Sequence, residues 1–291
     1  MKRILITGKN SYVGTSVKKY LLKWTDKYLV DEMSVRGDDW KKVDFSKYDV
    51  IFHVAGIAHV DTKKVDEKTK KLYYQVNTDL ADAVAKKAKN DGVKQFIYMS
   101  SAIVYGDSAP IGKTKVVTKA TKPEPANFYG DSKLQAENKL KKLKDSDFKV
   151  ALLRPPMIYG DGCKGNYQML RKIALKLPVF PKVKNERSMI FVKNFAEFVK
   201  QVVDNGYDGI YCPSNQETVA TYEIVREIAR ANNKNILIVP GFTWALKLMS
   251  HLTPIVNKAF GNMVYDKKLT LHCDYCKYSM IDSVKEIEKT A

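Results

Sequence analysis

A tyrosine and a lysine four residues apart form the pair in this sequence best suited to proton transfer, Tyr129 and Lys133. On a helix this spacing places both side chains on one face, one turn apart. An ammonium group beside a tyrosine stabilises the phenolate and lowers a pKa that is otherwise about 10. A tyrosine tuned in this way exchanges protons near neutral pH. We therefore predict that both residues are catalytic, although the same spacing is also common in surface pairs.

A serine in the same half of the chain makes the catalytic interpretation more specific. Ser101 follows the apolar run 95–99, which is typical of a buried strand. The carboxyl end of a parallel strand lies where ligands bind in sheets with helices on both faces. There the hydroxyl of Ser101 can hold the substrate oxygen that gains or loses a proton. We predict Ser101 as the third catalytic residue.

A glycine-containing loop near the N-terminus is typical of a phosphate-binding turn. The strand at 3–7 leads into the loop and then into a helix from about residue 11. The first glycine permits a sharp turn, the last permits close packing of helix on strand, and the helix dipole attracts a pyrophosphate. A serine replaces the usual middle glycine; it costs about 1 kcal/mol if the position needs positive φ, but its hydroxyl can bind phosphate. The predicted cofactor residues of this loop are Gly8, Asn10, Ser11, Tyr12, Val13 and Gly14.

Two later segments fit the same cofactor. Asp44 can accept a hydrogen bond from an adenine amino group while Phe45 packs on the ring. The strand at 50–54 ends in small residues that let a cofactor approach the backbone. These residues are Val54, Ala55 and Gly56.

The end of the second strand bears on the choice between NAD and NADP. An acidic residue there normally binds the ribose hydroxyls of NAD, but the strand predicted at 28–35 is followed by Arg36, and Asp31 and Glu32 lie too early unless the strand is shorter. Arg36 can face the 2′-phosphate of NADP, or it is a solvated surface residue. The cofactor is therefore NAD or NADP, and Arg36 favours NADP.

Short apolar strands alternate with longer helices through the first half of the chain. This alternation predicts an α/β fold, a Rossmann-like doubly wound parallel sheet. We expect an NAD(P)-binding domain at 1–160 and a smaller substrate-binding region at 161–291, with some chain crossing back to the sheet. The predicted strands span 3–7, 28–35, 50–54, 95–99 and 149–153, and the predicted helices span 11–24, 72–89, 129–144, 194–204 and 222–231.

Charge and cysteine content exclude several classes of protein. The 291 residues carry a net charge of +18, with 50 Lys and Arg against 32 Asp and Glu. Most of the basic residues are lysines spread along the chain, which favours a solvated surface attractive to anionic substrates over nucleic-acid binding. Cys273 and Cys276 form a lone Cys-x-x-Cys without a second ligand pair, so we predict reduced thiols and no metal site. No run is apolar enough for a membrane span or a signal peptide, and we expect a cytoplasmic protein.

The segment 241–260 has an apolar stripe at helical spacing. We interpret it as a helix that faces the core; contact with a membrane surface is the alternative. The stripe consists of Trp244, Leu248, Leu252, Ile255 and Val256.

Taken in order, these motifs resemble the extended short-chain dehydrogenases of the nucleotide-sugar epimerase and dehydratase family. The resemblance implies that Ser101 and Tyr129 contact the oxygen at the reacting carbon, usually C4, and that Lys133 holds the nicotinamide ribose. It also implies a cofactor contact for Pro156 and substrate contacts for Asn166 and Arg187, the latter at the nucleotide diphosphate. The matching pieces are the Gly8–Gly14 loop, Asp44-Phe45, His53-Val54-Ala55-Gly56, Asn77, Ser101 with Val104-Tyr105-Gly106, Tyr129 with Lys133, and Arg154-Pro155.

The resemblance also narrows the reaction. The dehydratases of the family carry Asp and Glu where this chain has Ala102 and Ile103, which leaves 4-epimerases and 4-keto reductases. The chain is also similar to proteins of capsule and O-antigen clusters, which include reductases of a UDP-4-keto-6-deoxy-HexNAc and UDP-glucose 4-epimerases. The short chain and the missing acidic residue at the end of the second strand favour reduction of a UDP-4-keto-6-deoxy-HexNAc, with a UDP-glucose or UDP-N-acetylglucosamine 4-epimerase as the alternative. An NADP-binding sensor or scaffold ranks lower because all three catalytic residues are present. The family also implies a homodimer through the helices at 72–89 and 129–144.

Overall fold

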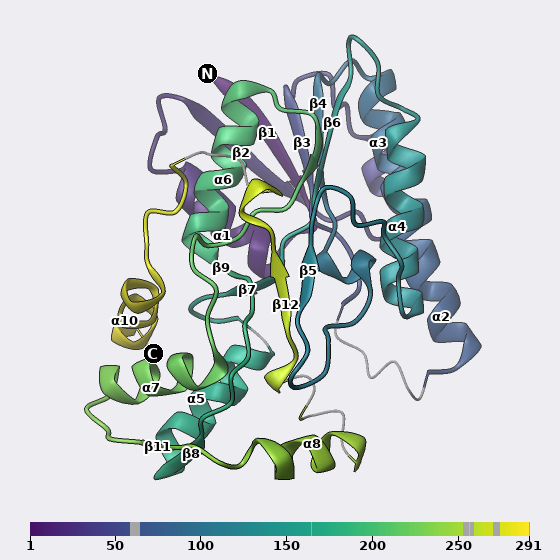
Figure 1. The fold of residues 1–291 in the computed structure, drawn as a ribbon. Coiled ribbons are helices and arrows are strands. Elements are labelled where there is room, and N and C mark those ends of the chain that lie inside the picture. Colours follow the sequence, from purple (N-terminus) through teal and green to yellow (C-terminus); the bar gives the residue numbers. More distant parts are fainter. Residues whose placement is uncertain (59–64, 164, 253–255, 257–258, 270–273, 291) are drawn as a thin grey trace. The chain divides into compact units, whose positions relative to one another are not determined.

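A computed structural model describes residues 1–58, 65–163, 165–252, 256, 259–269 and 274–290 (Figure 1). The chain forms two compact units, each assembled from separate segments. Unit 1 comprises Met1–Gly106, Lys122–Pro155 and Phe195–Pro213, and unit 2 comprises Asp107–Thr121, Pro156–Asn194 and Ser214–Ala291. The assignment of cofactor binding to 1–160 and of substrate binding to 161–291 stays a prediction.

Unit 1 is built on a six-stranded sheet with the order β10-β6-β4-β3-β1-β2, in which every neighbouring pair is parallel. The predicted parallel sheet is thus confirmed. The order in which strands are added to the sheet reverses between β1 and β3, and ligands bind at such a point in sheets of this type. The strands are β1 Lys2–Thr7, β2 Tyr28–Met33, β3 Val50–His53, β4 Gln95–Met99, β6 Lys149–Leu153 and β10 Gly209–Tyr211.

Helices cover both faces of this sheet. Four side chains in register across β1, β3, β4 and β6 form the floor of one core, and small residues of α3 and α4 pack on them. These four are Leu5, Ile51, Phe96 and Val150. Helices α1 and α6 lie on the opposite face (Figure 1). The helices of unit 1 are α1 Tyr12–Leu21, α2 Glu67–Tyr74, α3 Leu80–Asn90, α4 Phe128–Lys141 and α6 Val192–Asn205.

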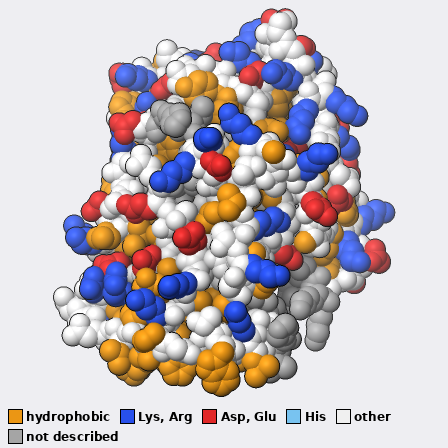
Figure 2. Space-filling view, viewed as in Figure 1, with side chains coloured by type: hydrophobic (Ala, Val, Ile, Leu, Met, Phe, Trp, Pro, Cys, Tyr) orange, Lys and Arg blue, Asp and Glu red, His pale blue; other side chains and the backbone are white. Residues whose placement is uncertain are grey.

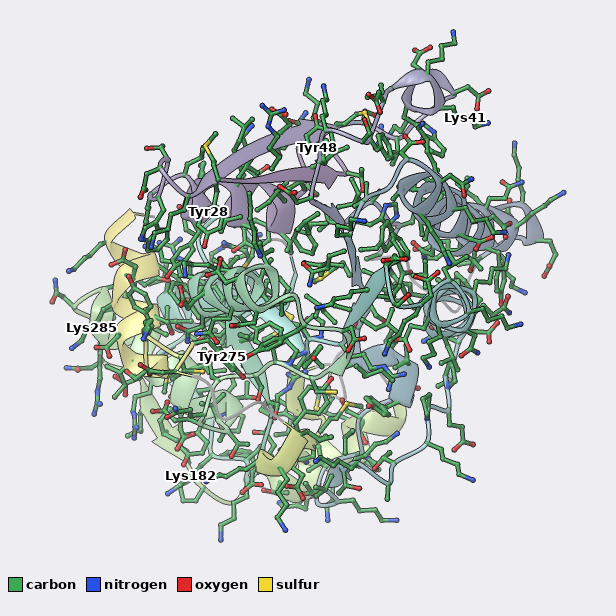
Figure 3. All side chains as sticks on the ribbon, turned by 90° about the horizontal axis from the view of Figure 1, so that it is seen from above. Tyr28, Lys41, Tyr48, Lys182, Tyr275 and Lys285 are labelled. Atoms are coloured by element: carbon green, nitrogen blue, oxygen red, sulfur yellow. The ribbon has the colours of Figure 1, made fainter. Side chains whose placement is uncertain are left out.

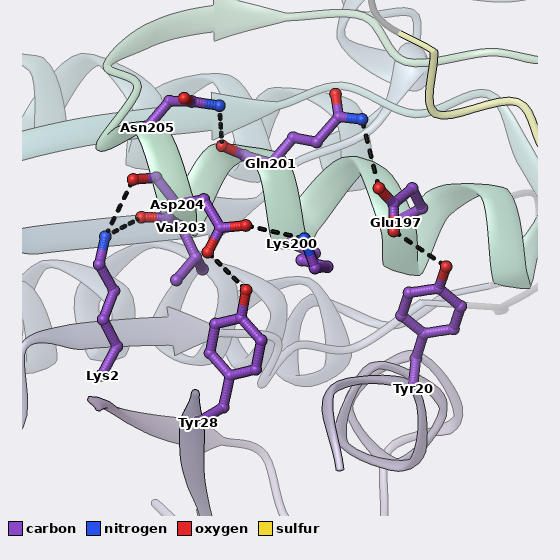
Figure 4. A network of polar contacts seen from close by, with 9 residues as sticks. All are labelled: Lys2, Tyr20, Tyr28, Glu197, Lys200, Gln201, Val203, Asp204 and Asn205. Atoms are coloured by element: carbon purple, nitrogen blue, oxygen red, sulfur yellow. Dashed lines mark hydrogen bonds and ion pairs between the residues drawn. The ribbon is translucent and has the colours of Figure 1, made fainter. Parts of the chain in front are cut away.

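Polar contacts bind α6 to the first elements of the chain, about 180 residues earlier (Figure 4). Tyr28 donates to Asp204, and Tyr20 donates to Glu197 at 2.9 Å. Lys2 donates to the backbone carbonyls of Val203 and Asp204. These bonds explain why a late segment of the sequence belongs to unit 1.

The helix predicted at 72–89 is interrupted. It consists of α2 and α3 joined by a π-helical turn, Gln75–Asp79. Such turns are rare and occur frequently at functional sites. The buried residues Asn77 and Thr78 lie in this turn.

Unit 2 contains three pairs of short parallel strands and several helices. Its strands pair as β5 Lys115–Val117 with β12 Met263–Tyr265, β7 Met157–Tyr159 with β9 Met189–Phe191, and β8 Val179–Pro181 with β11 Leu237–Val239. Its helices are α5 Asn166–Lys176, α7 Thr221–Ala231, α8 Thr243–Leu252 and α10 Met280–Thr290. None of the helices in the described ranges is both long and apolar enough to cross a membrane.

Helix α8 corrects one prediction. Its apolar stripe does not face the core, because the side chains of Trp244 and Leu248 are 72% and 63% exposed. Val256, beyond the helix, is buried. The side chain of Leu252 and the whole of Ile255 lie outside the described residues, as does Cys273.

Candidate active site

The loop after β1 approaches the end of β3 closely. Gly8 has a φ of +119°, and a Cβ built on it would lie 2.7 Å from the backbone nitrogen of Ala55. A Cβ on Gly14 would lie 2.5 Å from the hydroxyl of Ser11 and 3.0 Å from Ile6. Both glycines are therefore required by the packing of loop, helix and strands.

Ser11 acts as the N-cap of α1. Its φ is −71°, and its hydroxyl accepts a hydrogen bond from the Gly14 nitrogen at 3.1 Å. The positive φ, +65°, falls instead on Asn10. The cost considered for a serine at this position therefore does not arise. Tyr12 and Val13 begin α1, so the loop presents a helix N-terminus, which suits a pyrophosphate.

A second close approach joins the end of β3 to α4. A Cβ on Gly56 would lie 3.0 Å from both the Asn77 amide oxygen and the Lys133 ammonium. Asn77 accepts from the Ile57 nitrogen at 2.8 Å and donates to the Ser132 hydroxyl at 3.1 Å. Asn77 thus fixes the loop after β3 against the helix that carries Tyr129 and Lys133. The sequence motif contained Asn77, but no role was predicted for it.

The structure brings Ser101 to Tyr129. Ser101 caps the 3₁₀ turn Ala102–Tyr105, and its side chain lies close enough to Tyr129 to lower the pKa of the phenol, against the larger effect of burial. The close packing depends on Gly130, because a Cβ there would lie 2.8 Å from the Ile103 carbonyl oxygen. A glycine directly after Tyr129 therefore lets α4 approach the serine.

The titration of this pair differs from the prediction. Burial raises the pKa of Tyr129 to about 12. Lys133 donates to the Met99 carbonyl at 2.9 Å, and its ammonium is not among the groups that shift the pKa of Tyr129. Burial lowers the pKa of Lys133 to about 8, against an opposing effect of Glu137. Tyr129 therefore holds its proton at neutral pH in this structure.

A buried ion pair supports the same helix, and its glutamate was not predicted. Glu137 accepts from Ser100 at 2.6 Å and from the Arg154 Nε at 2.9 Å. Arg154 also donates to the Tyr105 hydroxyl at 2.7 Å. Glu137 lies four residues after Lys133 and is fully buried. The i, i+4 spacing from Lys133 was the available signal.

His53 is a neutral residue of the core. Its Nδ1 lies 2.8 Å from the Thr7 hydroxyl, and it is fully buried. Burial, with the nearby Lys133 charge, lowers its pKa to about 3. His53 therefore carries no charge at neutral pH.

The residues predicted for the adenosine end occupy different environments. Asp44 is exposed, and hydrogen bonds from Ser46 lower its pKa. Phe45 is fully buried in the core of unit 1, which argues against its predicted packing on an adenine ring. Arg36 is exposed beyond the end of β2.

The two acidic residues of β2 are already engaged. Glu32 pairs with Lys18 at 3.1 Å. Asp31 accepts from the hydroxyl of Tyr48, which is labelled in Figure 3. Strand β2 ends two residues earlier than predicted, at Met33, so Glu32 stands one residue before the end of the strand, with its carboxylate paired to Lys18.

The predicted substrate residues lie in unit 2. Arg187 is partly buried and donates to the Ala259 carbonyl at 3.1 Å, and burial lowers its pKa. Asn166 is the first residue of α5, after Gly165 with a φ of +105°. Pro156, predicted for the cofactor, is the first residue of a segment of unit 2. Their approach to the residues of unit 1 stays a prediction.

Comparison with known proteins gives a consistent result. Residues 4–211 match the model of the NAD dependent epimerase/dehydratase family. The chain is 32% identical to a UDP-glucose 4-epimerase of Vibrio cholerae over 91% of this chain and 87% of the relative. It is 29% identical to the N-acetyl-alpha-D-glucosaminyl-diphospho-ditrans,octacis-undecaprenol 4-epimerase of Escherichia coli O157:H7, over 80% and 73% of the two chains.

Solved structures show the same fold. The UDP-N-acetylglucosamine 4-epimerase of Bacillus cereus aligns with a TM-score of 0.77 and 16% identity, over 100% of this chain and 99% of that chain. The dTDP-4-dehydrorhamnose reductase of Bacillus anthracis, in complex with NADP, aligns with a TM-score of 0.72 and 19% identity, over 100% and 99%. At this identity the likeness concerns the fold.

Proposed function

Since the chain belongs to the NAD dependent epimerase/dehydratase family, we propose that it performs NAD(P)-dependent redox chemistry at C4 of a diphosphate-linked sugar. The observation that carries this proposal is the catalytic group in unit 1. The side chain of Ser101 lies close enough to Tyr129 to lower the pKa of its phenol, and Lys133 follows one turn later on α4. The two carboxylates used for elimination are absent, because Ala102 and Ile103 occupy their positions.

The cofactor residues fit a dinucleotide. The turn at Gly8, the N-terminus of α1 and the close approach at Gly56 form a cradle in which added side chains have no room. Lys133 would hold the nicotinamide ribose, and the loop amides would hold the pyrophosphate. When bound, the nicotinamide supplies or accepts the hydride.

Tyr129 and Ser101 are residues that can serve a reduction at C4. Tyr129 would donate its proton to O4 while the C4 carbonyl becomes an alcohol. Ser101 orients the same oxygen through its hydroxyl. We therefore propose reduction of a UDP-4-keto-6-deoxy-HexNAc as the reaction.

Epimerisation at C4 is the second candidate. The observation that favours it is the 32% identity to the Vibrio cholerae UDP-glucose 4-epimerase along most of the chain. In this reaction Tyr129 removes the proton from the 4-hydroxyl and returns it after the keto sugar has turned over. The same three residues serve both reactions, so the direction depends on the substrate supplied.

We propose that the sugar of the substrate is carried on a diphosphate ester. Arg187 is the guanidinium proposed to bind it, with Asn166 on the sugar side. The two relatives act, by their names, on a UDP-sugar and on a sugar linked through a diphosphate to undecaprenol. Both substrates share the sugar diphosphate group, and a UDP-sugar is the form we propose for this chain.

The test is the absorbance of the reduced nicotinamide. Purified protein is mixed with NADPH or NADH and a UDP-4-keto-6-deoxy-HexNAc made in place by a separate dehydratase. We expect stoichiometric loss of the reduced cofactor, slowed about 10²–10⁴-fold in Tyr129→Phe, because the proton donor is missing. Tyr74→Phe is the matched control, since the Tyr74 hydroxyl donates to Asp131 on α4 and Tyr74 is not one of the proposed catalytic residues. Activity should survive in the control.

The alternatives give different results. Interconversion of UDP-glucose or UDP-N-acetylglucosamine with its galacto epimer, without added reductant, would replace the reductase by the epimerase. Neither activity in the wild type, or full activity in Tyr129→Phe, would overturn the proposed chemistry.

The choice of cofactor has a separate test. We propose that Arg36 binds a 2′-phosphate, which predicts that Arg36→Ala raises the KM for NADPH about 10-fold, as expected for loss of a charged hydrogen bond. The KM for NADH serves as the internal control and should not change. An equal change for both cofactors would remove Arg36 from this role.

A further inference from the structure

The surface of unit 2 carries an apolar patch that the proposed chemistry does not use. Its members are exposed by 44% to 72% and belong to β8, β11, the turn after β11, and α8. Figure 2 shows hydrophobic side chains gathered at the lower edge of the view, over these elements. The apolar patch consists of Val179, Leu237, Phe242, Trp244, Leu248 and Met249.

The secondary structure makes this patch continuous. Val179 and Leu237 are register partners in the pair of β8 with β11. The chain then turns at Gly241, with a φ of +97°, and enters α8. Trp244 and Leu248 are one helical turn apart and both project outward. Single exposed apolar residues are ordinary, but a contiguous group of this kind marks an interaction site.

The charges around the patch indicate its partner. Residues 162–185 and 228–265, which supply the whole patch, contain ten Lys and Arg and neither Asp nor Glu, and two of the ten, Arg171 and Arg230, pair with glutamates of other segments. Lys182 and Lys184 line a hollow with Gly241 and Thr243, next to the start of α8, and Lys182 lies at the periphery of the view in Figure 3. The exposed lysines of these segments are Lys172, Lys176, Lys182, Lys184, Lys234 and Lys247.

We propose that this patch docks the protein on the surface of an anionic lipid bilayer. Trp, Phe and Leu side chains insert at the boundary of headgroups and acyl chains, while lysines beside them contact anionic headgroups. A helix of ten residues is far too short to span the bilayer, so α8 lies in the plane of the interface. This binding function goes beyond the proposed reaction and is independent of it.

The first experiment uses the full chain and vesicles. The protein is sedimented with vesicles of phosphatidylglycerol and phosphatidylcholine, and with vesicles of phosphatidylcholine alone. We expect binding to the anionic vesicles that weakens as salt is raised, and much weaker binding to the neutral ones. Absence of binding to anionic vesicles at low salt would overturn the proposal.

Variants distinguish binding through the apolar patch from nonspecific binding through other exposed apolar residues. Trp244→Ser combined with Leu248→Ser should weaken binding to anionic vesicles about 100-fold, because two inserted apolar side chains are lost. Ile281→Ser on α10, also an exposed apolar residue of unit 2, is the matched control and should bind as the wild type does. Equal weakening by the control would count against the patch.

Tryptophan fluorescence supplies an independent measurement. Among the three tryptophans, Trp40 is buried and Trp244 is the most exposed. Brominated lipids should quench the emission of the wild type on anionic vesicles, and Trp244→Phe should remove most of that quenching. Quenching unchanged by Trp244→Phe would overturn the proposed insertion of α8 into the bilayer surface.

A second copy of the chain as the occupant would give a different outcome. If the wild type is a dimer in light scattering, binds no vesicles, and becomes monomeric in the double variant, a second copy of the chain covers the patch. Because these assays contain no sugar substrate, their failure leaves the proposed reaction standing. Loss of the reaction in turn leaves the docking proposal standing.

Discussion

Helices α4 and α8 depart from the usual burial of apolar residues in opposite ways: α4 buries polar and charged side chains, and α8 exposes large apolar ones. In α4, Ser132, Lys133 and Glu137 are at most 5% exposed. In α8, Trp244 and Leu248 are mostly exposed. Charged groups are seldom buried unless they are paired, and large apolar side chains seldom gather on a surface without a partner.

The two helices differ in where the partners of their unusual side chains lie. The buried polar groups of α4 have their partners inside unit 1, from Met99 to Arg154. The exposed apolar groups of α8 have none among the described residues that would remove them from solvent. Helix α4 is thus complete within the fold, whereas α8 requires a surface outside it. Four predictions test this comparison.

The largest effect is expected where the buried charge of α4 loses its partner. Glu137→Ala leaves Arg154 buried without its carboxylate, and we expect the free energy of unfolding to fall by about 3–5 kcal/mol. Urea unfolding measures the change. Glu67→Ala is the control, because the exposed pair of Glu67 with Lys70 contributes at most about 1 kcal/mol. A loss below 1 kcal/mol in Glu137→Ala would mean that the ion pair does not support α4.

The second prediction concerns the pH dependence caused by Lys133. The folded protein loses this proton at about pH 8, whereas the unfolded chain keeps it to about 10.5. Between these values the unfolded state binds more protons, so the stability rises with pH. The cost of burying the ammonium is fully present below pH 8.

Comparison with Lys133→Met isolates this effect from other titrating groups. Relative to the variant, the wild type should gain about 1–3 kcal/mol of unfolding free energy between pH 8 and 10. Urea unfolding across this range measures it. A constant difference between the two proteins would contradict the lowered pKa.

Gly130 tests the packing that joins α4 to Ser101. A Cβ in Gly130→Ala would stand 2.8 Å from a backbone oxygen, so we expect a loss of about 1–3 kcal/mol from overpacking. The turnover number should fall as well, because the helix carrying Tyr129 moves away from Ser101. Unchanged unfolding and unchanged turnover would show that the turn at Ala102–Tyr105 moves freely.

Much of unit 1 could be predicted from the sequence because its signals are local. The strands 95–99 and 149–153 were predicted with the bounds that the structure has, since short apolar runs between turns are typical of buried parallel strands. The residues of the glycine loop, and Tyr129 with Lys133, were predicted from their spacing together with the order of motifs that resembles the family.

The remainder depends on contacts between distant parts of the chain. The pKa of Tyr129 was expected to fall, but burial dominates and Lys133 is bound to Met99. The π-helical turn at Asn77 needs partners on α4 that are 55 residues away. The orientation of α8 was predicted wrongly, because an apolar stripe shows only that one face avoids water, not what covers that face.

The smallest effect is expected on α8, and it completes the comparison. Because Trp244 and Leu248 contribute little to the core, Trp244→Ser and Leu248→Ser should each change the free energy of unfolding by less than about 0.5 kcal/mol. Leu152→Ala, at a buried position of β6, is the contrasting control and should cost about 2–5 kcal/mol. A loss above 2 kcal/mol in the α8 variants would mean that these side chains are covered in solution. Helix α8 would then be packed as α4 is, and its exposed face would not be available to a bilayer.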